Sequence, residues 1–271
     1  REQLGGRLYG EQVYLELRAS LLALGELDAA ETAQRLWVEQ SYLREPRSRT
    51  IYAPIPKNAC TYFKTALVLN GPNKDAFLAG RDKTDAHKFI RKNNSNHRLD
   101  NLQLMKSERF FKFAILRNPF KRLASAYADI AVRPLRWREI PDAPLHPLVH
   151  AYQRSQGERL DLTRSISFAA FIDAVVNTRD PALDHHFRSQ ASFLPDPDAF
   201  DLIADCDNLD PLFDALAARR WCFDEVGERN ETQYADLDAA TCADMPAGAL
   251  HQGGGAPRWT ALFDADLFSK V

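Results

Sequence analysis

The sequence predicts an α/β protein with a central parallel sheet flanked by helices. Short apolar runs at residues 51–55 and 111–116 each pass within a few residues into a helical pattern, and a third run at 200–204 precedes another helix. Strand–loop–helix units of this kind are typical of parallel sheets. We therefore expect a main domain over residues 46–271, preceded by a helical hairpin over residues 1–45.

The expected hairpin consists of two apolar stripes at helical spacing within residues 9–43, separated by a turn at Gly25–Asp28. The run from Leu21 to Ala30 resembles the inter-helix stretch of a tetratricopeptide repeat. Because one repeat cannot bury its own faces, we favour a hairpin packed on the main domain, with the last repeat of a longer array as the alternative. These helices are candidates for contact with a protein partner.

The first half of the main domain contains two strand–helix units. A strand over residues 51–55 is followed by a helix over 61–69. A strand over 111–116 is followed by a helix over 119–131, which has proline at its first position. Residues 71–98 are polar and are expected to form a loop.

The second half of the main domain is less regular. A proline-rich segment over residues 134–147 is expected to be irregular. The remaining expected elements are helices over 167–176 and 208–220, a strand over 200–204, a flexible glycine-rich loop over 251–257 and a last helix near Leu262.

The composition is that of an ordinary globular protein. Of the 271 residues 45% are hydrophobic, and 35 Lys and Arg against 37 Asp and Glu give a net charge of −2. These values exclude a disordered chain, and the chain is long enough to form a stable core that needs no disulfide or metal ion. The small net charge argues against a nucleic-acid partner bound by a surface that is basic all round. No apolar run approaches the roughly 18 residues of a membrane helix, and four widely separated cysteines favour reduced thiols and a cytoplasmic location.

The segment Pro56-Lys57-Asn58-Ala59-Cys60-Thr61 is a candidate anion-binding loop. It joins a strand directly to a helix, so its backbone N–H groups and the positive helix end can face an anion. Lys57 adds a positive charge, Thr61 adds a hydroxyl, and Lys64 follows one turn later. The glycines of a Walker A loop are absent. Taken alone, such a segment can also be a plain strand–helix turn.

Arg117 and Ser125 form a second candidate. Arg117 ends the strand over 111–116, at the sheet edge where α/β proteins bind ligands. Ser125 lies two helical turns beyond Pro119, where its hydroxyl could face the same side. A guanidinium fork with a hydroxyl suits a terminal phosphate, although a capping arginine and a packing serine are the alternative.

Together the two segments resemble signatures of the sulfotransferases that use 3′-phosphoadenosine-5′-phosphosulfate (PAPS), in their carbohydrate, Golgi-type, family 2-like branch. Residues 56–64 resemble its 5′-phosphosulfate loop, PK-x-x-C-T-x-x-K, and residues 117–127 its 3′-phosphate motif, R-[DEN]-P-F-x-R-L-x-S-A-Y. Residues 184–190 resemble a D-x-H-[WF]-x-x-Q segment, and 200–209 a strand and helix start. The resemblance spans about residues 50–220 and implies a three-layer, P-loop-like fold.

The resemblance also implies roles in donor binding. Lys57 would contact the phosphosulfate and stabilise charge on the leaving oxygen, and Arg117 with Ser125 would bind the 3′-phosphate. The other residues expected at the nucleotide are Asn58, Ala59, Cys60, Thr61, Lys64 and, on a late covering loop, Arg258. For Cys60 we favour a packing role, because the reaction uses no thiolate. The reaction is an in-line displacement for which no metal is expected.

A histidine base suits removal of the acceptor's proton near neutral pH. We favour His87, by its place between the two motifs, with His97 as the alternative. His185 or His186 could instead supply the base or grip the acceptor, or could be surface histidines. Arg188 and Gln190 are candidates for the acceptor side, with a plain surface ion pair as the alternative.

The expected activity is transfer of a sulfuryl group from PAPS to a hydroxyl, favouring a saccharide, with 3′-phosphoadenosine-5′-phosphate (PAP) as the product. A P-loop kinase and a non-catalytic nucleotide-binding module are the alternatives, and a Golgi-lumenal fragment without its anchor is the alternative to a cytoplasmic protein. Residues 81–122 carry 12 basic against 4 acidic side chains, and residues 196–244 carry 14 acidic against 3 basic. The basic stretch would steer a polyanionic donor toward His87 and Arg117.

Overall fold

A computed structural model describes most of the chain, in two units. Unit 1 comprises residues 1–117 and 189–230, and unit 2 comprises residues 118–188 and 231–271. The described residues are 25, 42–80, 86–92, 102–132, 146–159, 161, 166–180, 183–227 and 242–271. The expected hairpin over residues 9–43 therefore lies almost wholly outside the described residues. Each unit is described by itself below.

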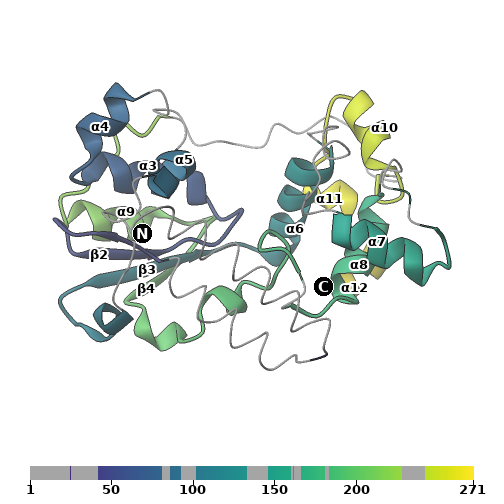
Figure 1. Ribbon diagram of the computed structural model, residues 1–271, viewed down its shortest axis with the longest axis horizontal. Coiled ribbons are helices and arrows are strands. Elements are labelled where there is room, and N and C mark those ends of the chain that lie inside the picture. Colours follow the sequence, from purple (N-terminus) through teal and green to yellow (C-terminus); the bar gives the residue numbers. More distant parts are fainter. Residues whose placement is uncertain are drawn as a thin grey trace, which may run out of the picture. The chain divides into compact units, whose positions relative to one another are not determined.

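Unit 1 is built on a four-stranded sheet in the order β1-β2-β3-β4 (Figure 1). The strands are β1 (Leu43–Glu45), β2 (Thr50–Ala53), β3 (Phe111–Leu116) and β4 (Leu202–Asp205). β2, β3 and β4 run parallel, which confirms the predicted α/β class, whereas β1 pairs antiparallel with β2. β1 is not expected from the sequence, because three residues are too few to display a periodic pattern.

Alternation along the strands divides the apolar side chains of unit 1 between two faces. Tyr52 and Phe113 stack at 4.8 Å in the cluster on one face, whereas Ile51 and Ala114 belong to the cluster on the other. Helices cover the first face, and 3₁₀ turns cover the second (Figure 1). The helices are α3 (Cys60–Asn70), α4 (Lys74–Ala79), α5 (Ala86–Lys92) and α9 (Asp210–Ala217), and the turns are Leu102–Lys106 and Ala191–Phe193.

The predicted loop over residues 71–98 is wrong where α4 and α5 form. Phe77 of α4 and Phe89 of α5 are buried and meet edge to face at 5.0 Å between ring centroids. These few apolar residues anchor two short helices to the first face of the sheet. The sequence does not predict these helices, because each has too few turns to show an apolar stripe and most of the surrounding residues are polar.

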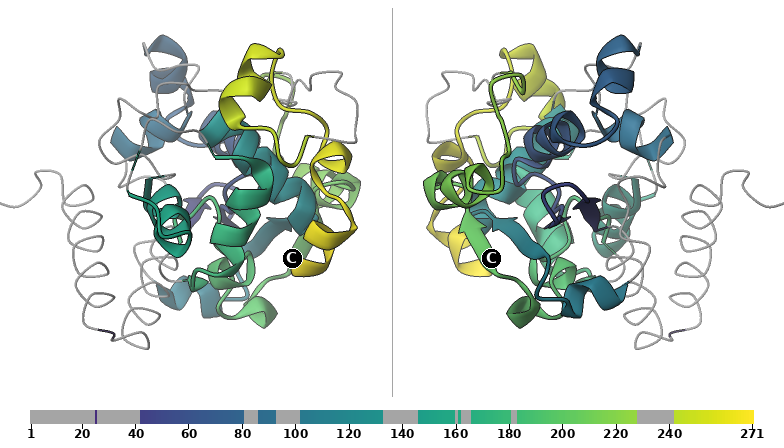
Figure 2. Two further views of the ribbon diagram at one scale, coloured as in Figure 1. Left: turned by 90° about the vertical axis from the view of Figure 1, so that its right-hand side faces the viewer. Right: turned by 90° about the vertical axis from the view of Figure 1, so that its left-hand side faces the viewer.

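Unit 2 is helical. Its elements are α6 (Pro119–Tyr127) with a π-helical turn at Ala128–Val132, α7 (His146–Ser155), α8 (Phe168–Val176), α10 (Ala247–Gln252), α11 (Trp259–Leu262) and α12 (Ala265–Lys270). The yellow C-terminal helices lie against α6, its π-helical turn and α8 (Figure 2). The expected helix over 167–176 is confirmed, with the Ser167 side chain capping it. α7 begins inside the segment expected to be irregular, and α10 extends into the loop expected over 251–257.

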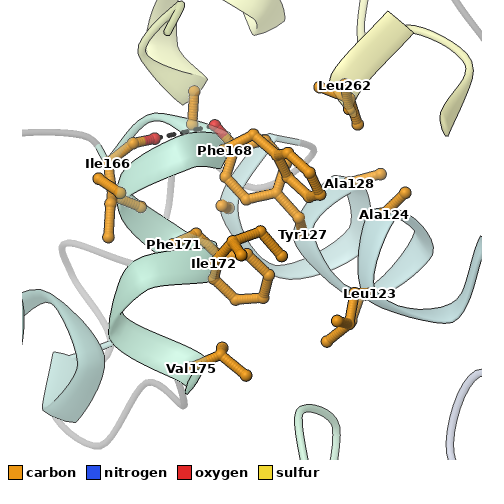
Figure 3. Close-up of a cluster of buried hydrophobic side chains, with 14 of the residues drawn as sticks. Leu123, Ala124, Tyr127, Ala128, Ile166, Phe168, Phe171, Ile172, Val175 and Leu262 are labelled. Atoms are coloured by element: carbon orange, nitrogen blue, oxygen red, sulfur yellow. Dashed lines mark hydrogen bonds between the residues drawn. The ribbon is translucent and has the colours of Figure 1, made fainter. Parts of the chain in front are cut away.

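Tyr127 lies at the centre of the core of unit 2 (Figure 3). Its ring meets Phe168 edge to face at 5.2 Å, and its hydroxyl donates a hydrogen bond to the Ile166 carbonyl at 2.8 Å. This pairing satisfies the one polar atom that a fully buried tyrosine brings into a core. In the part of the chain that the structure describes, no helix is long and apolar enough to cross a membrane.

Candidate functional site

The turn between β2 and α3 has an unusual backbone for a segment without glycine. Lys57 has φ 71° and Ala59 has φ 54°, while Asn58 between them lies outside the positive-φ region. A positive φ costs a residue with a side chain roughly 1–2 kcal/mol. Alternation of this kind turns successive N–H groups toward one concavity, which is a typical anion-binding arrangement. Backbone strain that is retained in a turn often indicates a functional site.

The N-terminus of α3 is left open. Its capping position is Ala59, no side chain makes a capping hydrogen bond, and the first turn has no acidic residue. The first N–H groups of a helix have no partner within the helix, and the helix dipole makes this end positive. The open end of α3 is therefore suited to an anion supplied from outside.

Asn58 fixes this turn to the neighbouring strand. The side chain is fully buried, and its Nδ2 donates to the carbonyl oxygen of Ile115 at 2.7 Å and to Gln190 Oε1 at 2.6 Å. Its Oδ1 is buried without a hydrogen-bond partner. Asn58 thus uses its side chain as a scaffold, while its backbone remains part of the turn.

Gln190 completes the connection between the turn and β3. Its Oε1 accepts from the Arg117 N–H at 3.0 Å, and its Nε2 donates to the Arg117 carbonyl at 2.7 Å. The Arg117 guanidinium in turn donates through Nη1 to the Lys57 carbonyl at 3.0 Å. The structure therefore brings Lys57, Asn58 and Arg117 together at the carboxyl edge of β2 and β3. The sequence predicts Gln190 on the acceptor side, and its scaffold role between Asn58 and Arg117 is not expected there.

His87, on α5, lies beside the start of α3. Its Nε2 is 3.0 Å from Thr61 Oγ1, and its Nδ1 is 3.1 Å from Lys64 Nζ. An ammonium group can only donate, so Nδ1 must be the acceptor. A neutral His87 then carries its proton on Nε2 and donates to the Thr61 hydroxyl. The structure places His87, the predicted base, next to the β2–α3 turn, with the Nδ1 lone pair engaged by Lys64.

The same neighbours act on Cys60. Burial opposes ionisation of the thiol, but the hydrogen bond with His87 and the positive charge of Lys64 outweigh it, so the pKa of Cys60 falls to about 6. A thiolate there is stabilised by the same field that would attract an anionic ligand. The ionisation of Cys60 therefore reports on the electrostatics of the turn.

In the turn between β3 and α6, a side chain of the turn itself accepts hydrogen bonds from the first N–H groups of the helix. Asn118 caps α6, its Oδ1 accepting from the N–H groups of Phe120 at 3.0 Å and Lys121 at 3.2 Å. Ser125 lies on α6 in unit 2 and is 5% exposed, whereas Arg117 belongs to unit 1. Their joint role at a 3′-phosphate stays a prediction.

The remaining predicted residues lie in unit 2, except His97, which lies outside the described residues. Arg188 is buried and donates through Nη2 to the Leu183 carbonyl at 3.0 Å. His185 and His186 both face Asp184, and Arg258 is an exposed residue at the start of α11. Their roles at the acceptor and the nucleotide stay predictions.

Comparison with known proteins gives one match. The model of the sulfotransferase family matches residues 40–232. No curated protein and no solved structure matches the chain. The match covers more than half of the chain and includes the β2–α3 turn, His87 and Arg117. The chain therefore belongs to the sulfotransferase family, in its family 2-like branch.

Proposed function

We propose that this chain transfers a sulfuryl group from PAPS to a hydroxyl group of a saccharide, with residues 46–271 as the catalytic domain. The observation that carries the proposal is the open, strained β2–α3 turn beside Lys57 and Arg117. In a sulfotransferase this turn is the part that can hold a phosphosulfate. The hairpin over residues 1–45 serves as an appended partner-binding element.

The turn holds the 5′ end of the donor in this proposal. Backbone N–H groups from Ala59 to Thr61 face its phosphate, and Lys57 lies against the sulfate. The Asn58 N–H, which the sequence also suggests for this role, donates instead to the Ile55 carbonyl at 3.3 Å. Arg117 binds the 3′-phosphate together with Ser125, and Arg258 covers the nucleotide. The residues of unit 1 fit such a polyanion, because the turn combines a positive helix end with the cations Lys57, Lys64 and Arg117.

In the transfer step, a bond forms between sulfur and the acceptor oxygen as the bond from sulfur to the bridging phosphate oxygen breaks. Lys57 stabilises the negative charge that develops on the bridging oxygen, which remains on PAP. His87 takes the proton from the acceptor hydroxyl. PAPS supplies the activated sulfuryl group, so the residues act by positioning and electrostatics.

Lys64 controls when His87 can act as the base. Nδ1 accepts from Lys64 in the structure, so its lone pair is engaged. A bound polyanion draws the Lys64 ammonium toward itself, which releases Nδ1 for the acceptor hydroxyl. Donor binding thereby prepares the base, and the base stays blocked when no donor is bound.

A saccharide acceptor is favoured by the resemblance to the carbohydrate branch and by the basic stretch over residues 81–122, which suits an acidic glycan. A kinase would prefer Mg²⁺-ATP to PAP, and a binding module would bind PAP without turnover.

The test is a transfer assay with ³⁵S-labelled PAPS and three acceptor classes: oligosaccharides, tyrosine peptides and hydroxylated lipids. We expect label in an oligosaccharide, and a loss of roughly 10²–10³-fold in rate for Lys57→Ala. Lys270→Ala, which removes an exposed lysine of α12 outside the basic stretch, is the matched control and should keep the wild-type rate. Label only in peptides or lipids would overturn the saccharide proposal, and no transfer to any class would overturn the activity.

A further inference from the structure

The turn at Asp184, His185 and His186 in unit 2 brings three metal-ligating side chains together. Asp184 Oδ1 is 2.6 Å from His186 Nδ1, and Asp184 Oδ2 is 3.4 Å from His185 Nδ1. One ligand atom from each residue lies within 4.8 Å of the others. Both imidazole rings turn Nδ1 toward the one carboxylate, and their centroids are 4.0 Å apart.

Buried neighbours hold this turn in place. Leu183 before it and Phe187 after it are 4% and 2% exposed, so both ends are anchored in the core of unit 2. Arg122, which is also buried, donates to the carbonyl oxygens of His185 at 3.3 Å and Arg188 at 2.7 Å. The three side chains therefore project from a backbone whose conformation is already fixed.

The chemistry of the set suits a divalent transition metal. Two imidazole nitrogens and one carboxylate oxygen are ligands that Zn²⁺ and its first-row neighbours accept, with open positions left for water. Both carboxylate oxygens of Asp184 face an imidazole nitrogen, so the ligand atoms of the three residues point toward one place.

The cluster can also be reached from solvent. The side chains of Asp184, His185 and His186 are 24%, 41% and 26% exposed. An ion can enter without unfolding the turn, and the distance from Asp184 Oδ2 to His185 Nδ1 is close to the separation of neighbouring ligands around a zinc ion with bonds of about 2.0–2.1 Å. The Asp184–His186 pair must open slightly, since an ion replaces the proton between them.

We propose that Asp184, His185 and His186 form a binding site for one first-row divalent metal ion of the Zn²⁺ type, with water completing its coordination. The site lies in unit 2, and the bound ion is not a reactant in the sulfuryl-transfer step proposed above. Its consequence is local: a bound ion cross-links the turn that Arg122 supports and stabilises unit 2.

The test is a Zn²⁺ titration of the full chain, freed of metal by chelation, in competition with a chromogenic chelator. We expect one Zn²⁺ per chain, and a rise in Tm on its addition. Asp184→Asn, His185→Ala and His186→Ala should each weaken binding by at least about tenfold and abolish the Tm rise. Co²⁺ should give the absorption bands of an ion bound by nitrogen and oxygen.

Two control variants test whether the ion binds at another histidine or at a thiol. His150→Ala deletes an exposed histidine of α7 in the same unit, and Cys60→Ser deletes the low-pKa thiol of unit 1. Both should retain the stoichiometry and affinity of the wild type. Since His185 is the most exposed of the three ligands, His185→Ala should keep the near-ultraviolet circular dichroism of the metal-free protein. Absence of one-to-one binding, or binding that survives His185→Ala and His186→Ala, would overturn the proposal.

Discussion

The turn that joins β2 to α3 and the turn that joins β3 to α6 both follow a strand of the parallel sheet, but they begin their helices differently. After β2, α3 starts from Ala59 in the left-handed region, with no capping side chain. After β3, α6 starts from Asn118, whose side chain caps two N–H groups, with Pro119 at its first position. The first helix end is open and strained, and the second is closed and relaxed.

The difference separates two ways of binding a phosphate. An open helix end offers its backbone N–H groups and its dipole, whereas a closed one has already satisfied them. The β2–α3 turn can therefore bind through its backbone, while the β3–α6 turn must bind through side chains such as Arg117. The capping residue of α6 is a neutral amide, which adds no negative charge where an anion is expected.

Among substitutions near the open turn, removal of the His87 side chain should have the largest effect on the transfer rate. We expect His87→Ala to lower kcat for transfer by roughly 10²–10⁴-fold, because the acceptor hydroxyl loses its base. PAP binding should change little, since the N–H groups and cations of the turn remain. Transfer kinetics and PAP titration calorimetry separate the two effects.

His97→Ala is the matched control for this substitution. It should retain the wild-type kcat if His87 is the base. A full rate in His87→Ala with loss in His97→Ala would instead assign the base to His97.

Replacement of Gln190 should loosen the link between the two turns. Gln190→Leu leaves the Arg117 N–H and carbonyl without their Gln190 partner and removes one of the two acceptors of the Asn58 amide. We expect a loss of about 1–3 kcal/mol in the free energy of unfolding, measured in urea, together with weaker PAP binding. Gln156→Ala, an exposed glutamine of unit 2, should change neither. Wild-type PAP affinity in Gln190→Leu would show that the turn keeps its shape without this side chain.

Substitutions at the two capping positions, Ala59 and Asn118, should change the free energy of unfolding in opposite directions. Ala59→Gly relieves the positive φ and should raise the free energy of unfolding by up to about 1 kcal/mol. Asn118→Ala removes the α6 cap and should lower it by about 1 kcal/mol. Urea unfolding curves measure both. Destabilisation by Ala59→Gly would contradict the strain that we assign to the open turn.

The smallest expected effect is a shift in the pH at which Cys60 is alkylated. Because the thiol pKa is about 6, labelling by iodoacetamide should reach half its maximal rate near pH 6. The pKa of Cys60 in the folded protein lies below the ordinary thiol value of 9.0. Ionisation of Cys60 therefore stabilises the fold fully above pH 9, and this contribution is lost as the pH falls through 6.

Mass spectrometry of the Cys60 peptide measures the labelling profile. His87→Ala should move the midpoint upward, because the thiolate loses its hydrogen bond. A wild-type midpoint near pH 8 or 9 would contradict the field that we describe at the turn.

The strands and the donor turn could be predicted because their signals are local. The strand predicted over residues 111–116, which is apolar except for Lys112, matches β3 residue for residue. The match of residues 56–64 and 117–127 to the motifs locates Lys57, Thr61 and Arg117 from the sequence alone.

The rest depends on contacts that no short pattern contains. Gln190 reaches Asn58 across 132 residues of sequence, and its amide gives no local sign of that partner. α4 and α5 are set by Phe77 and Phe89 docking on the sheet, against a polar composition that favours a loop. β1 exists because its neighbour β2 pairs with it.

The most direct test of the donor turn is a thermal-shift titration with PAP, ATP and Mg²⁺-ATP, on the wild type and on Arg117→Ala. We expect PAP to raise the Tm more than either form of ATP, and Arg117→Ala to lose this rise. Arg154→Ala, an exposed arginine of α7, should keep it. A preference for Mg²⁺-ATP, or a PAP shift that Arg117→Ala retains in full, would contradict donor binding at this turn.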